Sequence, residues 1–254
     1  MYSMGKQDNI YEEGNLSGLP FSFNQEVTEV FEDMIDRSVP GYKTSLKLIA
    51  QFSKKYYQAN TNCYDIGCSL GASSLAIISG ANNAKVIAID NSEAMITECN
   101  NRYGDLVADE SIRFLQDDVC KSKLENASVI CINYVIQFLK LTERDKLIKK
   151  AFEALLPGGV LLISEKVHFT NKFQSRRLFQ LHHSFKSANG YSDLEIAGKR
   201  DSLEGVLLTE TQEVHINRAI SAGFSSAEKV LSNINFVTYK FAVSYTHLTL
   251  PTKA

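Results

Sequence analysis

The fold is decided by the segment YDIGCSLGA (residues 64–72), which has the pattern of a buried strand, a glycine turn and the start of a helix. Glycines in such a turn let the backbone approach a ligand closely, and helix N-terminal amides point toward it. A second apolar run ends about 20 residues later in Asp90, where a carboxylate can accept hydrogen bonds from both hydroxyls of a ribose. Turn and acid together predict a nucleoside site.

Outward from this turn, strand-like and helix-like runs alternate. Strands are expected at 62–66, 85–90, 112–115, 128–132 and 160–164, with helices around 72–78, 93–103 and 142–155. Two helices, at 24–37 and around 46–52, precede them, and a helix at 211–222 with strands at 226–231 and 235–243 follows. This order predicts a Rossmann-like α/β fold with a mostly parallel seven-stranded sheet, helices on both faces and a closing antiparallel strand pair.

The domain is expected to span residues 21–243. Residues 1–20 are polar and are expected to be disordered, and residues 244–254 continue no pattern and look like a non-native tail. A basic, mostly helical insertion at about 166–210 interrupts the alternation and is where substrate specificity is expected.

Composition narrows the class of protein. The chain of 254 residues is 44% hydrophobic, and its formal net charge of −2 gives no general footprint for stable nucleic-acid binding. The five cysteines form no CxxC pair, which favours reduced thiols in a cytoplasmic protein. No apolar run reaches the roughly 20 residues of a membrane span.

The glycine turn has two other interpretations. A nicotinamide dinucleotide site prefers G-x-G-x-x-G, but Ser69 stands at the second glycine position and Ala72 or Ser73 follows Gly71. The run 67–71 also matches the G-x-S-x-G elbow of serine hydrolases, with His215 later in the chain. An elbow needs earlier strands in the sheet, whereas the preceding region has the pattern of helices.

A third interpretation is the S-adenosylmethionine site of class I methyltransferases. Acidic or amide residues end successive strands, and a Leu-Leu-Pro-Gly-Gly run at 155–159 precedes the fifth strand. Each feature alone is weak because Asp at a strand end is commonly a turn or cap residue. Their joint order favours this interpretation, and the residues are Asp65, Asp90, Asp117, Asp118 and Asn133.

Further segments resemble one bacterial family, the carboxy-S-adenosyl-L-methionine synthases. The resemblance rests on RSVPGY at 37–42, on 65–71, on SEK at 164–166, on LHH at 181–183 with Lys186, and on ANGYS at 188–192 with Lys199 and Arg200. It runs from about Phe21 to Val243. RSVPGY and the stretch from ANGYS to Lys199-Arg200 are specific to the family, whereas the glycine turn is generic.

The resemblance implies that S-adenosyl-L-methionine and prephenate give carboxy-S-adenosyl-L-methionine and phenylpyruvate. The product supplies the carboxymethyl donor for wobble-uridine modification of transfer RNA. The resemblance also implies a homodimer in which the neighbouring subunit can supply the arginine. The implied ligand contacts, with Arg200 and Tyr42 as catalytic residues, are Tyr42, Gly67, Cys68, Ser69, Asp90, Asn91, Asp118, Val119, Asn133 and Arg200.

The chemistry of the basic residues fits this implication. The Arg200 guanidinium can make a two-point contact with the carboxylate placed on the sulfonium methyl. Prephenate is a dianion, and countercharges are expected from the insertion. Which of them contact prephenate stays open, and the candidates are Lys166, Arg176, Arg177, Lys199 and Arg200.

No metal is expected, because the adjacent His182 and His183 point in different directions on a helix and no nearby acid or thiol completes a ligand set. Tyr42 could be a packing residue, and Cys68 is more easily read as packing than as a nucleophile. Two alternatives stay open. One is an ordinary methyltransferase acting on a small molecule or transfer RNA, and the other is a catalytically idle S-adenosyl-binding module with a regulatory role.

Overall fold

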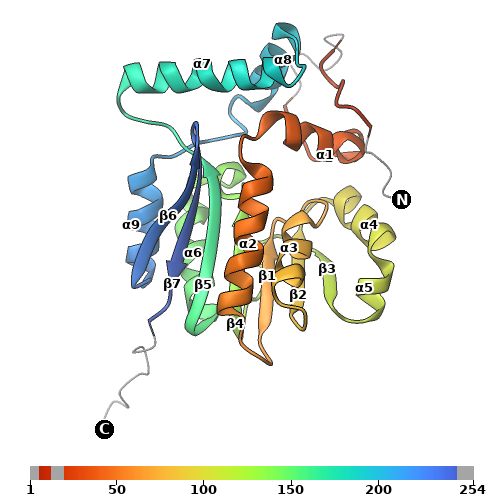
Figure 1. Ribbon diagram of the computed structural model, residues 1–254, viewed down its shortest axis with the longest axis vertical. Coiled ribbons are helices and arrows are strands. Elements are labelled where there is room, and N and C mark those ends of the chain that lie inside the picture. Colours follow the sequence, from red (N-terminus) through yellow and green to blue (C-terminus); the bar gives the residue numbers. More distant parts are fainter. Residues whose placement is uncertain (1–5, 13–19, 245–254) are drawn as a thin grey trace.

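The computed structural model describes residues 6–12 and 20–244, and its centre is a seven-stranded sheet with strand order β3-β2-β1-β4-β5-β7-β6 (Figure 1). Strands β1 to β5 pair in parallel, and β7 is antiparallel to both β5 and β6. The predicted fold class and closing strand pair are therefore confirmed. The strands are β1 (Asn62–Ile66), β2 (Lys85–Asp90), β3 (Ile112–Gln116), β4 (Ala127–Asn133), β5 (Leu155–Lys166), β6 (Ser226–Asn233) and β7 (Phe236–Ala242).

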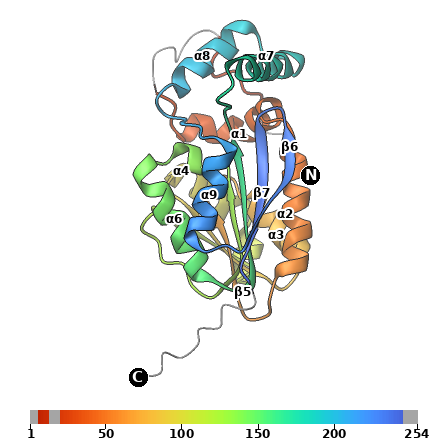
Figure 2. The same cartoon turned by 90° about the vertical axis from the view of Figure 1, so that its left-hand side faces the viewer.

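Both faces of the sheet are covered. The helices and one 3-10 turn are α1 (Gln25–Ser38), α2 (Tyr42–Tyr56), α3 (Ala72–Gly80), α4 (Glu93–Arg102), α5 (Gly104–Ala108), η1 (Ile136–Phe138), α6 (Leu141–Ala154), α7 (Lys172–Ala188), α8 (Asp193–Leu203) and α9 (Gln212–Ala222). Figure 2 shows α6 and α9 on one side of the sheet and α2 and α3 on the other.

Residue alternation explains this layering, because successive side chains of a strand point to opposite faces. Tyr64 and Ile66 of β1 pack into the cluster that includes Leu147 of α6. Cys63, one residue earlier, packs with Ile49 of α2 and Ile77 of α3. A strand buried on both faces reads as a continuous apolar run, as β4 does.

Strand β5 begins earlier than the sequence indicated. Leu155 pairs with Ala127, and the register then shifts before Val160 pairs with Val129. Pro157, Gly158 and Gly159 lie inside this irregular stretch. Because these residues are typical of turns, the sequence did not predict that the strand begins at Leu155.

Between β5 and α9 the chain forms α7 and α8, which lie across the top of Figure 1 above α1 and the sheet. Helix α8 begins at a capping box, in which the Ser192 side chain accepts the Glu195 amide and the Glu195 side chain accepts the Ser192 amide. This cap fixes the start of the helix that carries Lys199 and Arg200.

Residues 6–12 differ from the disorder expected of the N-terminus. Asp8 is 1% exposed and Tyr11 is 5% exposed, because both pack against distant helices that no local pattern reveals. The rest of the expected disordered segment, 1–5 and 13–19, and the expected tail from 245 onward lie outside the described residues. Within the described ranges, no helix is long and apolar enough to cross a lipid bilayer.

Candidate functional site

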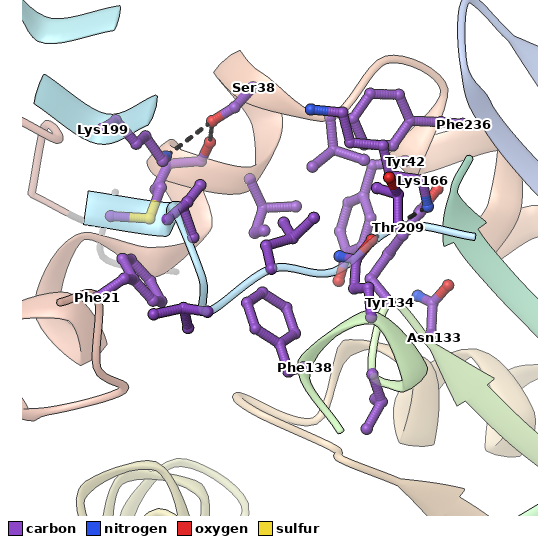
Figure 3. A pocket seen from close by; sticks show the side chains of 18 of the residues that line it. Phe21, Ser38, Tyr42, Asn133, Tyr134, Phe138, Lys166, Lys199, Thr209 and Phe236 are labelled. Carbon is purple, nitrogen blue, oxygen red and sulfur yellow. Dashed lines mark hydrogen bonds between the residues drawn. The ribbon is translucent and has the colours of Figure 1, made fainter. Parts of the chain in front are cut away.

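A cavity of about 860 Å³ lies at the carboxyl ends of the parallel strands, the edge where open α/β sheets bind ligands. Figure 3 shows Lys199 and Ser38 at one end, Asn133 and Tyr134 at the other, and Phe138 between them. All ten residues expected to contact the nucleoside line this one cavity: Tyr42, Gly67, Cys68, Ser69, Asp90, Asn91, Asp118, Val119, Asn133 and Arg200.

The glycine turn forms the floor of the cavity. Gly67 has φ +72°, and a Cβ there would lie 2.4 Å from Cγ2 of Val135. Its amide donates to the Ile89 carbonyl at 2.7 Å, which joins the turn to β2. Ser69 also has a positive φ of 46°. The turn therefore holds its backbone open to the cavity in a shape that a side chain at residue 67 would prevent.

Asp90 ends β2 beside this turn and is held by two backbone amides. Its Oδ2 accepts the Ser69 amide at 2.9 Å and its Oδ1 accepts the Ser92 amide at 2.9 Å. Burial raises the pKa of this carboxyl, although the amides oppose the effect. The acid is fixed in orientation and can still accept hydrogen bonds from a diol.

Asp65 lies behind the turn and does not line the cavity. Its Oδ2 accepts the Ser74 hydroxyl at 2.6 Å, and burial raises the pKa of its carboxyl to about 7. Among the described residues its Oδ1 has no hydrogen-bond partner. Asp65 therefore supports the turn from inside the protein rather than contacting a ligand.

The remaining strand-end residues are spread along the same wall. Asn91 is exposed and Val119 is buried. Asp118 accepts the Cys120 amide at 2.9 Å, and this hydrogen bond is the main cause that lowers the pKa of its carboxyl. The Asn133 side chain donates to the Ser73 hydroxyl at 3.1 Å, whereas its buried Oδ1 has no partner within the described part of the chain.

Tyr42 begins α2 directly after Gly41, whose φ of 82° allows the sharp entry into the helix. Its ring lies 6.2 Å from that of Tyr134, centroid to centroid. Burial is the main cause that raises the pKa of both phenols, so both stay neutral donors at physiological pH. In Figure 3 Tyr42 and Tyr134 lie beside Lys166 and Phe236.

Among the described residues, four cationic side chains line the cavity: Lys166, Lys186, Lys199 and Arg200. Burial is the main cause that lowers the pKa of Lys186 to about 8, and the charges of the other three contribute to this shift. Burial likewise lowers the pKa of Lys199 to about 8. Lys186 is therefore close enough to be repelled by the other three cations, and an anion would relieve that repulsion.

This result corrects part of the expected set of countercharges. Arg176 and Arg177 are exposed on α7 and do not line the cavity, because the helix turns that face toward solvent. Lys186 occupies the face of α7 that the cavity uses. Arg200 lies on α8 with an exposed side chain, and its Nε donates to Asp201 at 3.1 Å.

The sequence segments that carried the family resemblance meet in space. Arg37 of the first motif donates from Nε to the carbonyl of Asn189 in the second, at 2.8 Å, and its guanidinium lies 3.8 Å from the Tyr191 ring centroid. The Lys199 ammonium donates a hydrogen bond of 3.0 Å to the Ser38 hydroxyl. These motifs therefore join α1 to α8 at the cationic end of the cavity.

Sequence reasoning missed the apolar lining and one buried acid. Phe21, Phe23 and Phe138 form an aromatic cluster in the cavity wall, with the Phe23 and Phe138 centroids 5.3 Å apart. Asp8 lies 3.8 Å from the Lys199 ammonium. The aromatic residues carry no local signal beyond being apolar, and Asp8 lay in a segment expected to be disordered.

The two adjacent histidines have separate partners. His182 donates from Nε2 to the Ser38 carbonyl, and His183 donates to Asp193. Burial lowers the pKa of His182 to about 3, so its ring is neutral. Across residues 6–12 and 20–244, no group of three or more His, Cys, Asp or Glu side chains is arranged to hold a metal ion. All five cysteines are free thiols.

Comparison with known proteins places the chain in a family. A family model described as a methyltransferase domain matches residues 64–159. The carboxy-S-adenosyl-L-methionine synthase of Hahella chejuensis is 42% identical over 240 residues, which cover 92% of this chain and 97% of that protein. The protein of the same name from Yersinia pestis strain Pestoides F is 42% identical over 85% of this chain and 82% of its own length.

The structural comparison concerns the fold alone. The crystal structure of human N-acetylserotonin methyltransferase in complex with S-adenosylmethionine superposes with a TM-score of 0.58 at 14% identity, over 87% of this chain and 55% of that one. The 42% identity to the two synthases, over most of each chain, shows the family. The fold shared with the methyltransferase structure agrees with it. The chain belongs to the carboxy-S-adenosyl-L-methionine synthase family.

Proposed function

We propose that the protein is an enzyme that converts S-adenosyl-L-methionine and prephenate into carboxy-S-adenosyl-L-methionine and phenylpyruvate. The product would serve as the carboxymethyl donor for wobble-uridine modification of transfer RNA. The observation that carries the proposal is one cavity that combines a nucleoside-type wall with four cationic side chains. Family membership supports the same reaction.

The strand ends that line the cavity carry the kinds of groups that bind S-adenosyl-L-methionine. Asp90 would accept the ribose hydroxyls, and the open turn at Gly67 would let the methionine part approach the backbone. The unpartnered Oδ1 of Asn133 is an acceptor suited to an ammonium group. The proposed contacts also include Tyr42, Cys68, Ser69, Asn91, Asp118 and Val119, which share the lining.

The cationic end fits a dianion such as prephenate. Lys166, Lys186 and Lys199 line the wall that α7, α8 and β5 provide, and the charges of Lys166 and Lys199 help to lower the pKa of Lys186. Apolar side chains lie beside them, with Phe21 and Phe138 on the cavity surface. A compact ring bearing two carboxylates would meet both kinds of surface.

The reaction balances without a protein base. Prephenate loses carbon dioxide and hydroxide as its ring becomes aromatic, which leaves phenylpyruvate. Hydroxide takes a proton from the sulfonium methyl to give water, and the resulting ylide carbon forms a bond to carbon dioxide. The apolar part of the cavity wall would help to protect the ylide from water.

Arg200 is the proposed catalytic residue that distinguishes this reaction from methyl transfer, together with Tyr42. Its planar guanidinium would form a two-point contact with the carboxylate on the former methyl carbon. The side chain is exposed at the cavity and pairs only with its neighbour Asp201 among the described residues, and this weak surface pair can be exchanged for a ligand contact.

We also propose a homodimer in the cytoplasm. The family resemblance implies the dimer, and the exposed Phe173 on α7 and Leu194 on α8 provide apolar surface near the cavity. Light scattering would show a mass twice that of the 28.3 kDa chain. Mixed dimers of an Arg200→Ala subunit with an Asp90→Ala subunit would then show which subunit supplies Arg200, since activity in the mixture requires an arginine from the partner.

A conventional S-adenosyl-L-methionine-dependent methyltransferase is the second candidate function, because the fold and the methyltransferase-domain match fit it equally well. Mass spectrometry separates the two. The purified protein is denatured, its nucleoside identified, and fresh protein incubated with S-adenosyl-L-methionine with and without prephenate. Prephenate-dependent carboxylated product is expected, whereas S-adenosylhomocysteine or no product would contradict the synthase.

A further inference from the structure

A buried carboxylate outside the cavity faces one of its cations. Asp8 is 1% exposed and does not line the cavity, whereas Lys199 does. Asp8 Oδ2 lies 3.8 Å from Lys199 Nζ, and Lys199 is itself only 12% exposed. Burying an unpaired carboxylate is energetically unfavourable, so Asp8 needs a partner such as the Lys199 ammonium. The pair therefore belongs to the protein interior and is not a surface contact.

The segment 6–12, which carries Asp8, is joined to α1. The Asp8 amide donates to Asp33 Oδ2 at 2.7 Å, and Arg37 Nη1 donates to the Asp8 carbonyl at 3.1 Å. Lys6 forms a further ion pair with Glu29 at 2.6 Å. These contacts fix the backbone around residue 8 against the outer face of α1.

The same segment is joined to α8 and the loop before it. The Tyr191 hydroxyl donates to Asp8 Oδ2, and Tyr11 exchanges a hydrogen bond of 2.8 Å with the Ser202 hydroxyl. A Cβ on Gly198 would lie 3.3 Å from the Tyr11 ring, so the segment packs closely on the helix that carries Lys199. Asp8 is thus held from two sides beside one ammonium group.

We propose that Asp8 is a positioning residue for Lys199: its carboxylate holds the Lys199 side chain at the cavity wall as a cation that contacts the anionic second substrate. This inference rests on the proposed function for the identity of that substrate. In this proposal, segment 6–12 lies outside the cavity and keeps the Lys199 side chain inside it protonated.

Opposing effects on Lys199 explain why a partner is needed. Burial favours the neutral amine and lowers its pKa to about 8, while Asp8 raises the pKa and so opposes burial. Without Asp8 the pKa would fall further, and a smaller fraction of the amine would be protonated near neutral pH. The charged or titratable groups that face Lys199 or its neighbours are Asp8, Asp33, Arg37, Lys166, His182, Lys186, Tyr191 and Arg200.

The pH dependence of Asp8→Asn separates a charge effect from a structural one. If Lys199 loses about one pKa unit, about half of the wild-type amines but about a tenth of the variant amines are protonated at pH 8. The prephenate KM should then rise about fivefold at pH 8 and stay nearly unchanged at pH 6, where both amines are protonated. The affinity for S-adenosyl-L-methionine should be unaffected. Equal defects at both pH values would overturn the proposal.

Tyr11→Phe is the matched control, because it removes a hydrogen bond from the same segment without changing a charge. It should leave the pH profile of the prephenate KM as in the wild type. If Asp8→Asn does not fold, Asp8→Ser replaces it, since the serine hydroxyl can still accept from Tyr191. A Tyr11→Phe profile that matches the Asp8 variant would assign the effect to docking of the segment and would overturn the proposal.

A second measurement is independent of the proposed reaction. Lysines are methylated with ¹³C-formaldehyde, the Lys199 signal is identified by its absence in Lys199→Arg, and its pKa is read by NMR. Asp8→Asn should lower that pKa by about one unit or more, and an unchanged value would refute the ion pair's role. A lowered pKa combined with no prephenate response in any protein would contradict the proposed function while leaving the pairing intact.

Discussion

The two ends of the cavity are built in different ways. The nucleoside end is formed by neighbouring strands and the turns that follow them. Backbone amides hold its side chains in place, as the Ser69 amide does by donating to Asp90. The cationic end brings together the N-terminal segment, α1 and α8, where Tyr11 contacts Ser202, 191 residues away. Local chain geometry fixes one end, and long-range packing fixes the other. Substitutions at the two ends should therefore affect different substrates.

Loss of the acid at the nucleoside end should have the largest effect. Asp90→Ala removes the acceptor that we propose for the ribose and releases the Ser69 and Ser92 amides. We expect S-adenosyl-L-methionine to bind about 100-fold more weakly by calorimetry, since each hydrogen bond to a charged group contributes about 1.5–3 kcal/mol. Glu110→Gln, an exposed acid that does not line the cavity, is the control. Affinity retained within about threefold would contradict the assignment.

Arg200→Ala tests the contact that distinguishes product from substrate. The variant should lose about tenfold in its preference for carboxy-S-adenosyl-L-methionine over S-adenosyl-L-methionine, because the proposed partner of the guanidinium is the added carboxylate. Arg200→Lys keeps the charge and loses the two-point geometry, so an intermediate preference is expected. Equal discrimination by wild type and variants in competition binding would remove Arg200 from the site.

Lys186→Met tests the cationic end alone. This substitution keeps the length of the side chain and removes one charge from the lining, so the prephenate KM should rise several-fold, on the order of 1 kcal/mol in binding. The affinity for S-adenosyl-L-methionine should stay the same. Arg176→Met removes an exposed charge from the same helix and serves as the matched control. A similar rise of the KM in both variants would show that prephenate binding depends on the overall charge of the protein and not on a cation at the cavity.

Asp65→Asn should change only the pH dependence of folding stability. Burial raises the folded-state pKa of Asp65 to about 7, above its unfolded value, so the folded state binds the proton more tightly. Stability from this group is present below the unfolded pKa near 4 and is lost as pH rises toward 7. Urea titrations should show a flatter dependence between pH 4 and 7 in the variant. An identical slope would mean that Asp65 does not titrate there.

The nucleoside end was largely predictable from the sequence, because the strand period and glycine turn are local signals. The sequence placed β1 and β2 at their observed bounds and identified Gly67, Ser69 and Asp90, which line the cavity. Strand β5 was predicted too short because Pro157 to Gly159 resemble a turn. The predicted fold class was still correct, because β5 pairs in parallel with β4 along most of its length.

The cationic end was predicted less well. Charge alone could not separate Lys186, which lines the cavity, from Arg176 and Arg177, which are exposed on the same helix. The orientation of that helix depends on contacts with α8, the next helix along the chain, and with α1, which lies far away in the sequence. Asp8 was missed for the same reason, because its burial depends on Arg37 and Tyr191, which no local pattern connects to it.

Isotope transfer tests most directly whether the two ends form one reaction site. The protein is incubated with S-adenosyl-L-methionine and with prephenate labelled with ¹³C in the carboxylate on its ring, and the nucleoside product is examined by mass spectrometry and NMR. We predict that the label appears as a carboxyl carbon bonded to the former sulfonium methyl carbon, together with an equal amount of phenylpyruvate. An unlabelled nucleoside, or label released wholly as carbon dioxide, would contradict this account.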